Sequence, residues 1–279
     1  MAGVIIDSHV HVLPPAFRER RDQMAAADPW FAACHGDRRP IATAVELIAA
    51  MDAAGVDRAV CFTWPFRDQA LCVECNDHMV AVQRESPDRI IGFAIVNPAS
   101  PDAAAELRRC ARLGLRGVGE VNCDAQGFAL DDAAIAGVVE ASVELQMPWT
   151  LHCSEPVGHD YPGKGSTTPD QVARFAERHP SLRLIGAHLG GGLPLYAHMP
   201  EVEQLCRRMW FDTAAGPFLY QPSVYRAVVD LCGPSQLLFG SDFPLLKMDR
   251  YVSAFDEAGL TDSERRQLMG DAAATLLQI

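Results

Sequence analysis

The stretch IDSHVH at residues 6–11 decides how this chain folds, because an apolar strand runs directly into two histidines. His9 and His11 are two residues apart, so in an extended strand their side chains leave on the same face and can share one ion. A His-x-His pattern alone is as often structural as functional. Its weight therefore depends on what the rest of the chain places beside it.

Seven further apolar runs, rich in Val, Ile, Leu and Phe, follow along the chain, and each is short enough to be a strand buried on both faces. The eight predicted strands span residues 4–9, 57–64, 90–98, 115–122, 149–155, 182–189, 209–213 and 236–242. Helix signals separate them. Thr43 with Glu46 forms a capping box before one helix, and Ser100 is expected to cap another.

Strands that alternate with helices through short connectors imply parallel pairing and right-handed crossovers. Eight such strands predict an α/β fold, a distorted (β/α)₈ barrel of the TIM type, with an open doubly wound sheet as the competitor. The 279 residues show no repeat or domain-sized linker, so we expect one domain over residues 1–279. The longest connections, residues 13–41 and 156–168, are expected to lie at the barrel mouth.

The bulk composition excludes several classes of protein. A formal charge of −12 and the absence of any Lys/Arg run argue against nucleic-acid or anionic-membrane binding. The first residues do not resemble a signal peptide and no run of about 18 apolar residues occurs, which predicts a cytoplasmic protein with no membrane span. Cys72 and Cys75 form a C-x-x-C without a second pair, so buried helix thiols are expected rather than a metal or redox site.

Polar side chains gather where five of the predicted strands end. They are His9 and His11 on the first strand, Glu120 on the fourth, His152 on the fifth, His188 on the sixth and Asp242 on the eighth. Barrel enzymes place catalysis at this rim. Imidazoles with a carboxylate form a shell that zinc, iron or manganese accepts while leaving a position open for water.

Five segments carry a resemblance over nearly the whole chain: IDSHVH, MDAAGVDRAV at residues 51–60, LHCSEP at 151–156, AHLGGGLP at 187–194 and LFGSDFP at 238–244. The chain resembles the amidohydrolase superfamily, in its amidohydrolase-related branch of decarboxylases and hydrolases that includes aminocarboxymuconate semialdehyde decarboxylase. The resemblance implies that His9, His11, His152 and Asp242 bind a metal. It implies that His188 transfers a proton or orients substrate, with a supporting hydrogen-bond role as the alternative.

Glu120 departs from the single-metal decarboxylases of that branch. Other branches of the superfamily carry a carboxylated lysine or a bridging glutamate at the end of the fourth strand. Glu120 is therefore expected to bridge a second ion, ligate a single ion or bind substrate, and a salt-bridged structural glutamate is the alternative. The expected cofactor is a divalent metal, zinc first and manganese or iron as alternatives, with one or two ions.

The principal expectation is a metal-dependent hydrolase that cleaves an amide or ester bond of a small, carboxylate-bearing substrate. Asp242 would accept a proton from the metal-bound water, and His188 would stabilise the oxyanion or protonate the leaving group. Glu120 favours this reading over the first alternative, a non-oxidative decarboxylase of an aromatic or unsaturated acid. A metal-binding regulatory barrel without activity is the second alternative.

Substrate contacts are expected from the segment SEPVGHDYPGKG at residues 154–165, a polar, glycine-bearing loop. Lys164, His159 and Tyr161 are the candidates there for binding an acidic substituent, and Arg67 is a candidate cation on another loop. A solvated turn is the alternative for this loop. The resemblance also implies a homo-oligomer, whereas His198 and the other remaining histidines are expected to be structural or surface residues.

Overall fold

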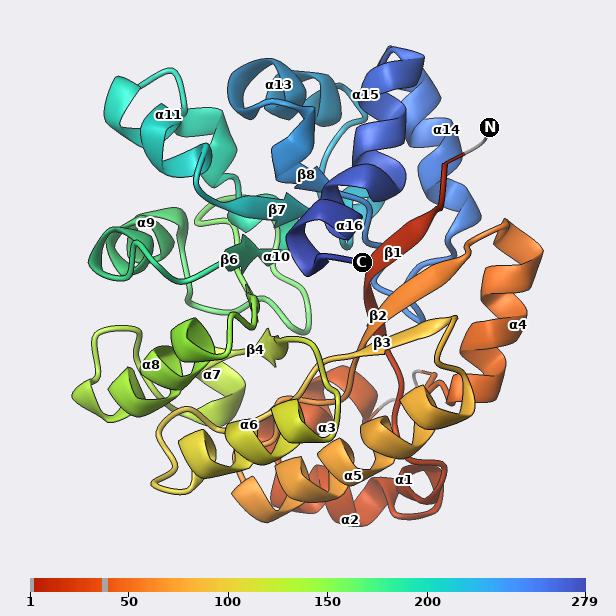
Figure 1. Cartoon of the computed structure of the whole chain (residues 1–279), viewed down its shortest axis with the longest axis vertical. Helices are drawn as coiled ribbons and strands as arrows, with labels where there is room; N and C mark the ends of the chain where they lie inside the picture. The colour runs from red at the N-terminus through yellow and green to blue at the C-terminus, as the bar shows by residue number, and fades with distance from the viewer. Residues whose placement is uncertain (1–2, 37–39) are drawn as a thin grey trace.

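The computed structural model describes residues 3–36 and 40–279, and within them eight parallel strands form the inner wall (Figure 1). The strands are β1 (Ile6–His11), β2 (Arg58–Phe62), β3 (Ile90–Gly92), β4 (Val118–Val121), β5 (Trp149–Leu151), β6 (Leu184–Gly186), β7 (Trp210–Asp212) and β8 (Leu237–Leu238). They pair in sequence order as a three-stranded sheet, β1-β2-β3, and a five-stranded sheet, β4 to β8. Single bridges, Ala94 with Val118 and Val10 with Phe243, join the two sheets into a closed barrel.

The predicted (β/α)₈ barrel is confirmed, with strands shorter than the apolar runs suggested. The α-helices are α1 (Ala16–Glu19), α2 (Arg21–Ala27), α3 (Pro29–His35), α4 (Ala44–Ala54), α5 (Gln69–Glu85), α6 (Ala103–Arg112), α7 (Cys123–Gln126), α8 (Ala136–Glu144), α9 (Pro169–Arg178), α10 (Ala187–Gly190), α11 (Pro200–Cys206), α12 (Gly216–Leu219), α13 (Ser223–Cys232), α14 (Asp249–Glu257), α15 (Asp262–Arg266) and α16 (Ala272–Leu277). Short 3₁₀ turns cover Ala133–Ile135, Leu193–Tyr196 and Pro234–Gln236, and Gln267–Asp271 is a π-helical turn.

Local sequence signals explain most of the helix ends. The capping box of Thr43 and Glu46 opens α4, and Gly55 closes it in a left-handed conformation at φ 69°. The prediction for Ser100 is wrong, because α6 begins at Ala103 after Asp102. The Ser100 hydroxyl instead accepts a hydrogen bond from the Asp102 N–H at 3.4 Å, which forms a turn ahead of the helix.

Two apolar clusters fix the two ends of the barrel. At its N-terminal end, β-strand residues such as Ile6 and Leu238 pack against Leu276 and Leu277 of α16, which covers that end. At the other end, Phe17 and other apolar residues of the long connection pack with Cys72 and Cys75 of α5. Both thiols are buried, and the Cys72 Sγ–H donates to the Phe66 carbonyl at 3.3 Å. Within the described residues, no helix is both long and apolar enough to cross a membrane.

Candidate metal centre

The first group of ligand atoms comes from β1, β4 and the loop after β8. The Nε2 atoms of His9 and His11 lie 3.1 Å apart. Asp242 Oδ1 lies 3.8 Å from the first and 3.5 Å from the second, and Glu120 Oε2 lies 3.8 and 3.7 Å from them. Ligands about 2.1 Å from a shared ion lie roughly 3 to 4 Å from one another. The spacing therefore fits one divalent ion.

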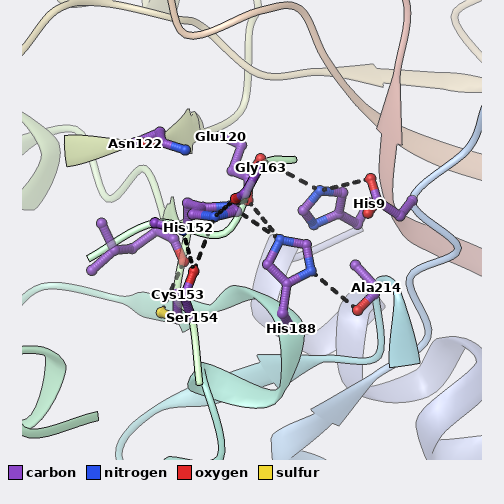
Figure 2. A network of polar contacts seen from close by, with 12 residues as sticks. His9, Glu120, Asn122, His152, Cys153, Ser154, Gly163, His188 and Ala214 are labelled. Carbon is purple, nitrogen blue, oxygen red and sulfur yellow. Dashed lines mark hydrogen bonds and ion pairs between the residues drawn. The ribbon is translucent and has the colours of Figure 1, made fainter. Parts of the chain in front are cut away.

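The second group contacts the other oxygen of the Glu120 carboxylate. Glu120 Oε1 is 2.9 Å from His152 Nδ1 and 3.2 Å from His188 Nε2, and these two nitrogens are 3.1 Å apart. Figure 2 shows that His9, His152 and His188 all contact the Glu120 carboxylate. His152 thus lies beside Glu120 and His188, and the ligand atoms of His188, Glu120 and His9 also lie within 4.8 Å of one another. That His152 shares an ion with His9 and His11 stays a prediction.

The outward ring nitrogens determine which protons the four histidines carry. Their partners are the Asp212 carboxylate for His9 Nδ1 at 2.8 Å, and the carbonyls of Thr63 for His11 Nδ1 at 3.1 Å, Gly163 for His152 Nε2 at 3.0 Å and Ala214 for His188 Nδ1 at 3.1 Å. Each partner only accepts hydrogen bonds, so each outward nitrogen is the donor and the inward nitrogen of a neutral ring presents a lone pair. Both groups are therefore convergences of acceptors, which require a positive charge at their centre. Imidazole and carboxylate donors suit zinc, iron or manganese.

The electrostatics of the ion-free site point the same way. Burial alone would lower the pKa of His9, yet the carboxylates of Asp212 and Glu120 raise that pKa to about 9. Burial likewise opposes the charge on His188, and its hydrogen bond and attraction to Glu120 raise its pKa to about 10. Burial works against the Glu120 carboxylate too, but His152 and His9 hold its pKa well below the ordinary value. A field that retains protons at these nitrogens also attracts a cation.

Unusual backbone geometry presents two of these side chains. His188 and Asp242 have φ values of 56° and 62°, in the left-handed region that non-glycine residues rarely adopt. Each lies just beyond its strand, where the left-handed turn sets the direction of the side chain. Gly240 permits the approach of the β8 loop to β1, because a Cβ at this position would lie 2.8 Å from the Cβ of His9. Such strain is typical of functional sites.

Asp212, which the sequence alone did not indicate, holds two of the site residues in place through hydrogen bonds. It is fully buried at the end of β7, where Oδ2 accepts from His9 and Oδ1 accepts from the backbone N–H groups of His188 and Ala214 at 2.9 and 3.1 Å. One carboxylate therefore orients a ligand from each group. A strand-end carboxylate inside an apolar run, WFDTAA at residues 210–215, was the available signal.

Replacing Asp212 with asparagine is expected to weaken metal binding about 10- to 100-fold. The amide oxygen of the asparagine would accept the hydrogen bonds from the backbone N–H groups of His188 and Ala214. The amide NH₂ would then face His9 Nδ1 and force that ring into the opposite tautomer. The inward Nε2 would then carry a hydrogen and could not bind an ion. Chelator competition measures the affinity. Asp230→Asn, in an exposed ion pair with Arg226, is the matched control, and equal affinities in the two variants would show that Asp212 does not set the tautomer.

The predicted substrate residues lie in a self-contacting loop and on the surface. Lys164 Nζ donates to the carbonyls of Val157 and His159, both at 3.1 Å. The ammonium group thus joins two parts of its own loop. The exposed His159 packs edge-on against Phe218 of α12, with ring centroids 5.4 Å apart. Arg67 is exposed on the loop after β2. A substrate-binding role for these three side chains stays a prediction.

Tyr161 and Trp30 lie closer to the centre than the other loop candidates. The Tyr161 hydroxyl donates to Glu155 Oε2 at 2.9 Å, three residues beyond His152. Trp30 of α3 approaches His152 edge-on with ring centroids 6.5 Å apart, so the long connection after β1 borders the site. An aromatic side chain in this position limits access of water to the histidines.

Comparisons with known proteins show the family and the fold of this chain. The family model described as amidohydrolase matches residues 6–279. The chain is 28% identical over 266 residues to gamma-resorcylate decarboxylase of Rhodococcus jostii, covering 77% of this chain and 79% of the relative. It is 26% identical to 6-methylsalicylic acid decarboxylase of Penicillium expansum, covering 97% and 95%. The fold matches 5-carboxyvanillate decarboxylase of Novosphingobium aromaticivorans, a structure with bound manganese, with a TM-score of 0.79 at 19% identity, covering 99% of this chain and 97% of that one.

These relatives contradict the hydrolase expectation, because they are themselves named as decarboxylases. The expectation depended on Glu120, and a carboxylate that binds a cation is equally compatible with a metal that anchors an acidic substrate. The resemblance drawn from the strand-end motifs, in contrast, is confirmed by a family model that spans nearly the whole chain. The protein is a (β/α)₈ barrel that belongs to the amidohydrolase family.

Proposed function

We propose that this protein is a metal-dependent, non-oxidative decarboxylase of a hydroxylated aromatic acid. The observation that carries the proposal is the convergence of four imidazoles and two carboxylates at the mouth of the barrel. The names of the curated relatives supply the reaction class. Both gamma-resorcylate and 6-methylsalicylate are benzoic acids with a hydroxyl beside the carboxylate.

We further propose a pair of divalent ions that share Glu120. His9, His11, Asp242 and Glu120 Oε2 would hold one, and His152, His188 and Glu120 Oε1 would hold the other. Manganese replaces zinc as the first candidate, because the same donors accept both and a structural relative contains manganese. When bound, such a cation acts as a Lewis acid that polarises a substrate oxygen and neutralises anionic charge. Metal identity and ion number are tested below.

The residues of the chain divide the remaining work. Decarboxylation requires a proton at the ring carbon that bears the carboxylate; the carbon–carbon bond then breaks, its electron pair returns to the ring and CO₂ leaves. Asp242 is positioned to carry that proton, since Oδ1 faces the two β1 histidines and leaves Oδ2 for proton transfer. The Ala214 carbonyl holds the His188 ring, and Trp30 restricts water beside His152.

The proposal is tested by CO₂ release from 2,6-dihydroxybenzoate and 2-hydroxy-6-methylbenzoate. We expect manganese-loaded protein to release CO₂ and the corresponding phenol in equal amounts. Chelator treatment should abolish release and added Mn²⁺ should restore it. Metal-loaded protein that binds these acids without releasing CO₂ would overturn the proposal and favour the regulatory barrel. Size-exclusion chromatography with light scattering would test the homo-oligomer, which stays a prediction.

A further inference from the structure

Three loops meet beside the ligand groups and bring together a small polar cluster, Glu155, Tyr161 and Tyr220. Glu155 and Tyr161 lie on the loop after β5, and Tyr220 follows α12 on the loop after β7. The β5 and β6 loops touch directly, because a Cβ on Gly191 would lie 2.5 Å from the carbonyl oxygen of Ser154. The Tyr220 hydroxyl reaches this junction as well, 3.6 Å from the corresponding position on Gly192.

The cluster contains polar atoms that the protein itself leaves without a partner. Tyr161 satisfies Oε2 of Glu155, but Oε1 of Glu155 and the hydroxyl of Tyr220 are both buried and unpartnered among the described side chains. A buried acceptor and a buried donor of this kind are costly unless a ligand or a water completes them. The negative charge of Glu155 also contributes, after burial, to raising the pKa of both tyrosines, so the two hydroxyls lie within its field and stay protonated.

The charges around the cluster restrict what can complete it. Lys164 is the cation of this loop, and its ammonium is held by two loop carbonyls, 5.8 Å from the centre of the Tyr161 ring. Arg18 of α1 donates to the Ile41 carbonyl and pairs with Glu46. Arg250 and Glu257 line a cavity together with Tyr220, so that cavity holds one charge of each sign. A phenolic hydroxyl can donate to Glu155 and accept from Tyr220, whereas a second carboxylate would meet a like charge.

Building on the proposed function, we infer that Glu155 and Tyr220 select the substrate: they bind a ring hydroxyl and reject a second carboxylate. The enzyme would therefore act on phenolic monocarboxylates and discriminate against phenolic dicarboxylates. Glu155 acts as a specificity residue here, and the reaction itself stays with the metal centre.

The test compares salicylate with 2- and 4-hydroxyisophthalate, which each add one carboxylate to it. Dissociation constants are measured by calorimetry on manganese-loaded protein, separately from CO₂ release. We expect wild type to bind salicylate at least about tenfold more tightly than either isophthalate. Glu155→Gln should bring the affinities within about threefold, and the matched control Glu203→Gln, on exposed α11, should retain the wild-type ratio.

A second variant guards against a folding defect in the first. Tyr220→Phe should weaken salicylate about fivefold and leave unsubstituted benzoate unchanged, since only the hydroxyl contact is lost. Equal binding of mono- and dicarboxylates by wild type, or an unchanged ratio in Glu155→Gln, would overturn the inference while CO₂ release still supported the proposed function. If the affinity ratios are as expected but no CO₂ is released, the proposed function alone is overturned. If none of these acids binds, both the proposed function and the inference are overturned.

Discussion

Glu120→Ala should lower the metal content from two ions per chain to at most one and reduce kcat/KM by about 10³-fold. The carboxylate offers one oxygen to each group of ligands, so its removal takes a donor from both positions. A loss of about 4 kcal/mol in transition-state stabilisation corresponds to roughly that factor and is within the range that a metal ion supplies. Plasma mass spectrometry of protein purified without chelator gives the ion count, and CO₂ release gives the rate.

Glu203→Ala is the control for this variant, because it removes a half-buried carboxylate that pairs with Arg207 at the end of the same helix. It should retain two ions and full activity. One ion per chain in both wild type and Glu120→Ala would show that Glu120 does not bridge. Absence of metal from wild type under replete conditions would contradict the whole centre.

Asp242→Asn should lower kcat by about 10² to 10⁴-fold while the protein keeps its fold and metal. The amide retains an oxygen for the ion but cannot carry the proton that the ring carbon needs. Asparagine also tolerates the left-handed backbone at this position better than other residues, which favours a folded variant. Single-turnover CO₂ release measures the chemical step, and the metal content is determined on the same sample.

The nearby exposed residue Asp249, at the start of α14, provides the matched control. Asp249→Asn should leave kcat unchanged. A rate within tenfold of wild type for Asp242→Asn, with metal bound, would assign the proton transfer to another group. Loss of both metal and activity would instead make Asp242 chiefly a ligand.

Much of the fold was predictable because buried parallel strands leave a strong mark on a sequence. Seven of the eight apolar runs contain a whole strand, and β1 begins within the first run and ends two residues beyond it, at His11. Strand lengths were less accessible, since residues past the ladder, such as those around Phe93, remain apolar and buried for packing reasons. Helix starts depend on one or two hydrogen bonds, which explains the error at Ser100.

The sequence indicated which residues lie at the candidate site but not which of them contact one another. The strand pattern placed His152 directly after β5, but only the structure shows that its Nδ1 lies 2.9 Å from Glu120 Oε1. Asp212 was missed because a buried carboxylate at a strand end has no periodicity of its own. Lys164 was given a binding role because its loop is polar, whereas two nearby carbonyls satisfy its ammonium. Loops carry few constraints that a single sequence reveals.

The barrel wall consists of two sheets that single bridges join, so the proposed metal would also contribute to the stability of the fold. His9 and His11 belong to one sheet, Glu120 belongs to the other, and Asp242 lies beside the bridge at Phe243. An ion held by all of them would link the two sheets, and ligand binding to the folded state adds stability in proportion to the logarithm of free metal over its dissociation constant. The lifetime of this protein in a cell would then depend on the supply of metal, as its catalysis does. Depletion of the ion would lower the amount of enzyme, because a larger fraction would unfold and be degraded by proteases.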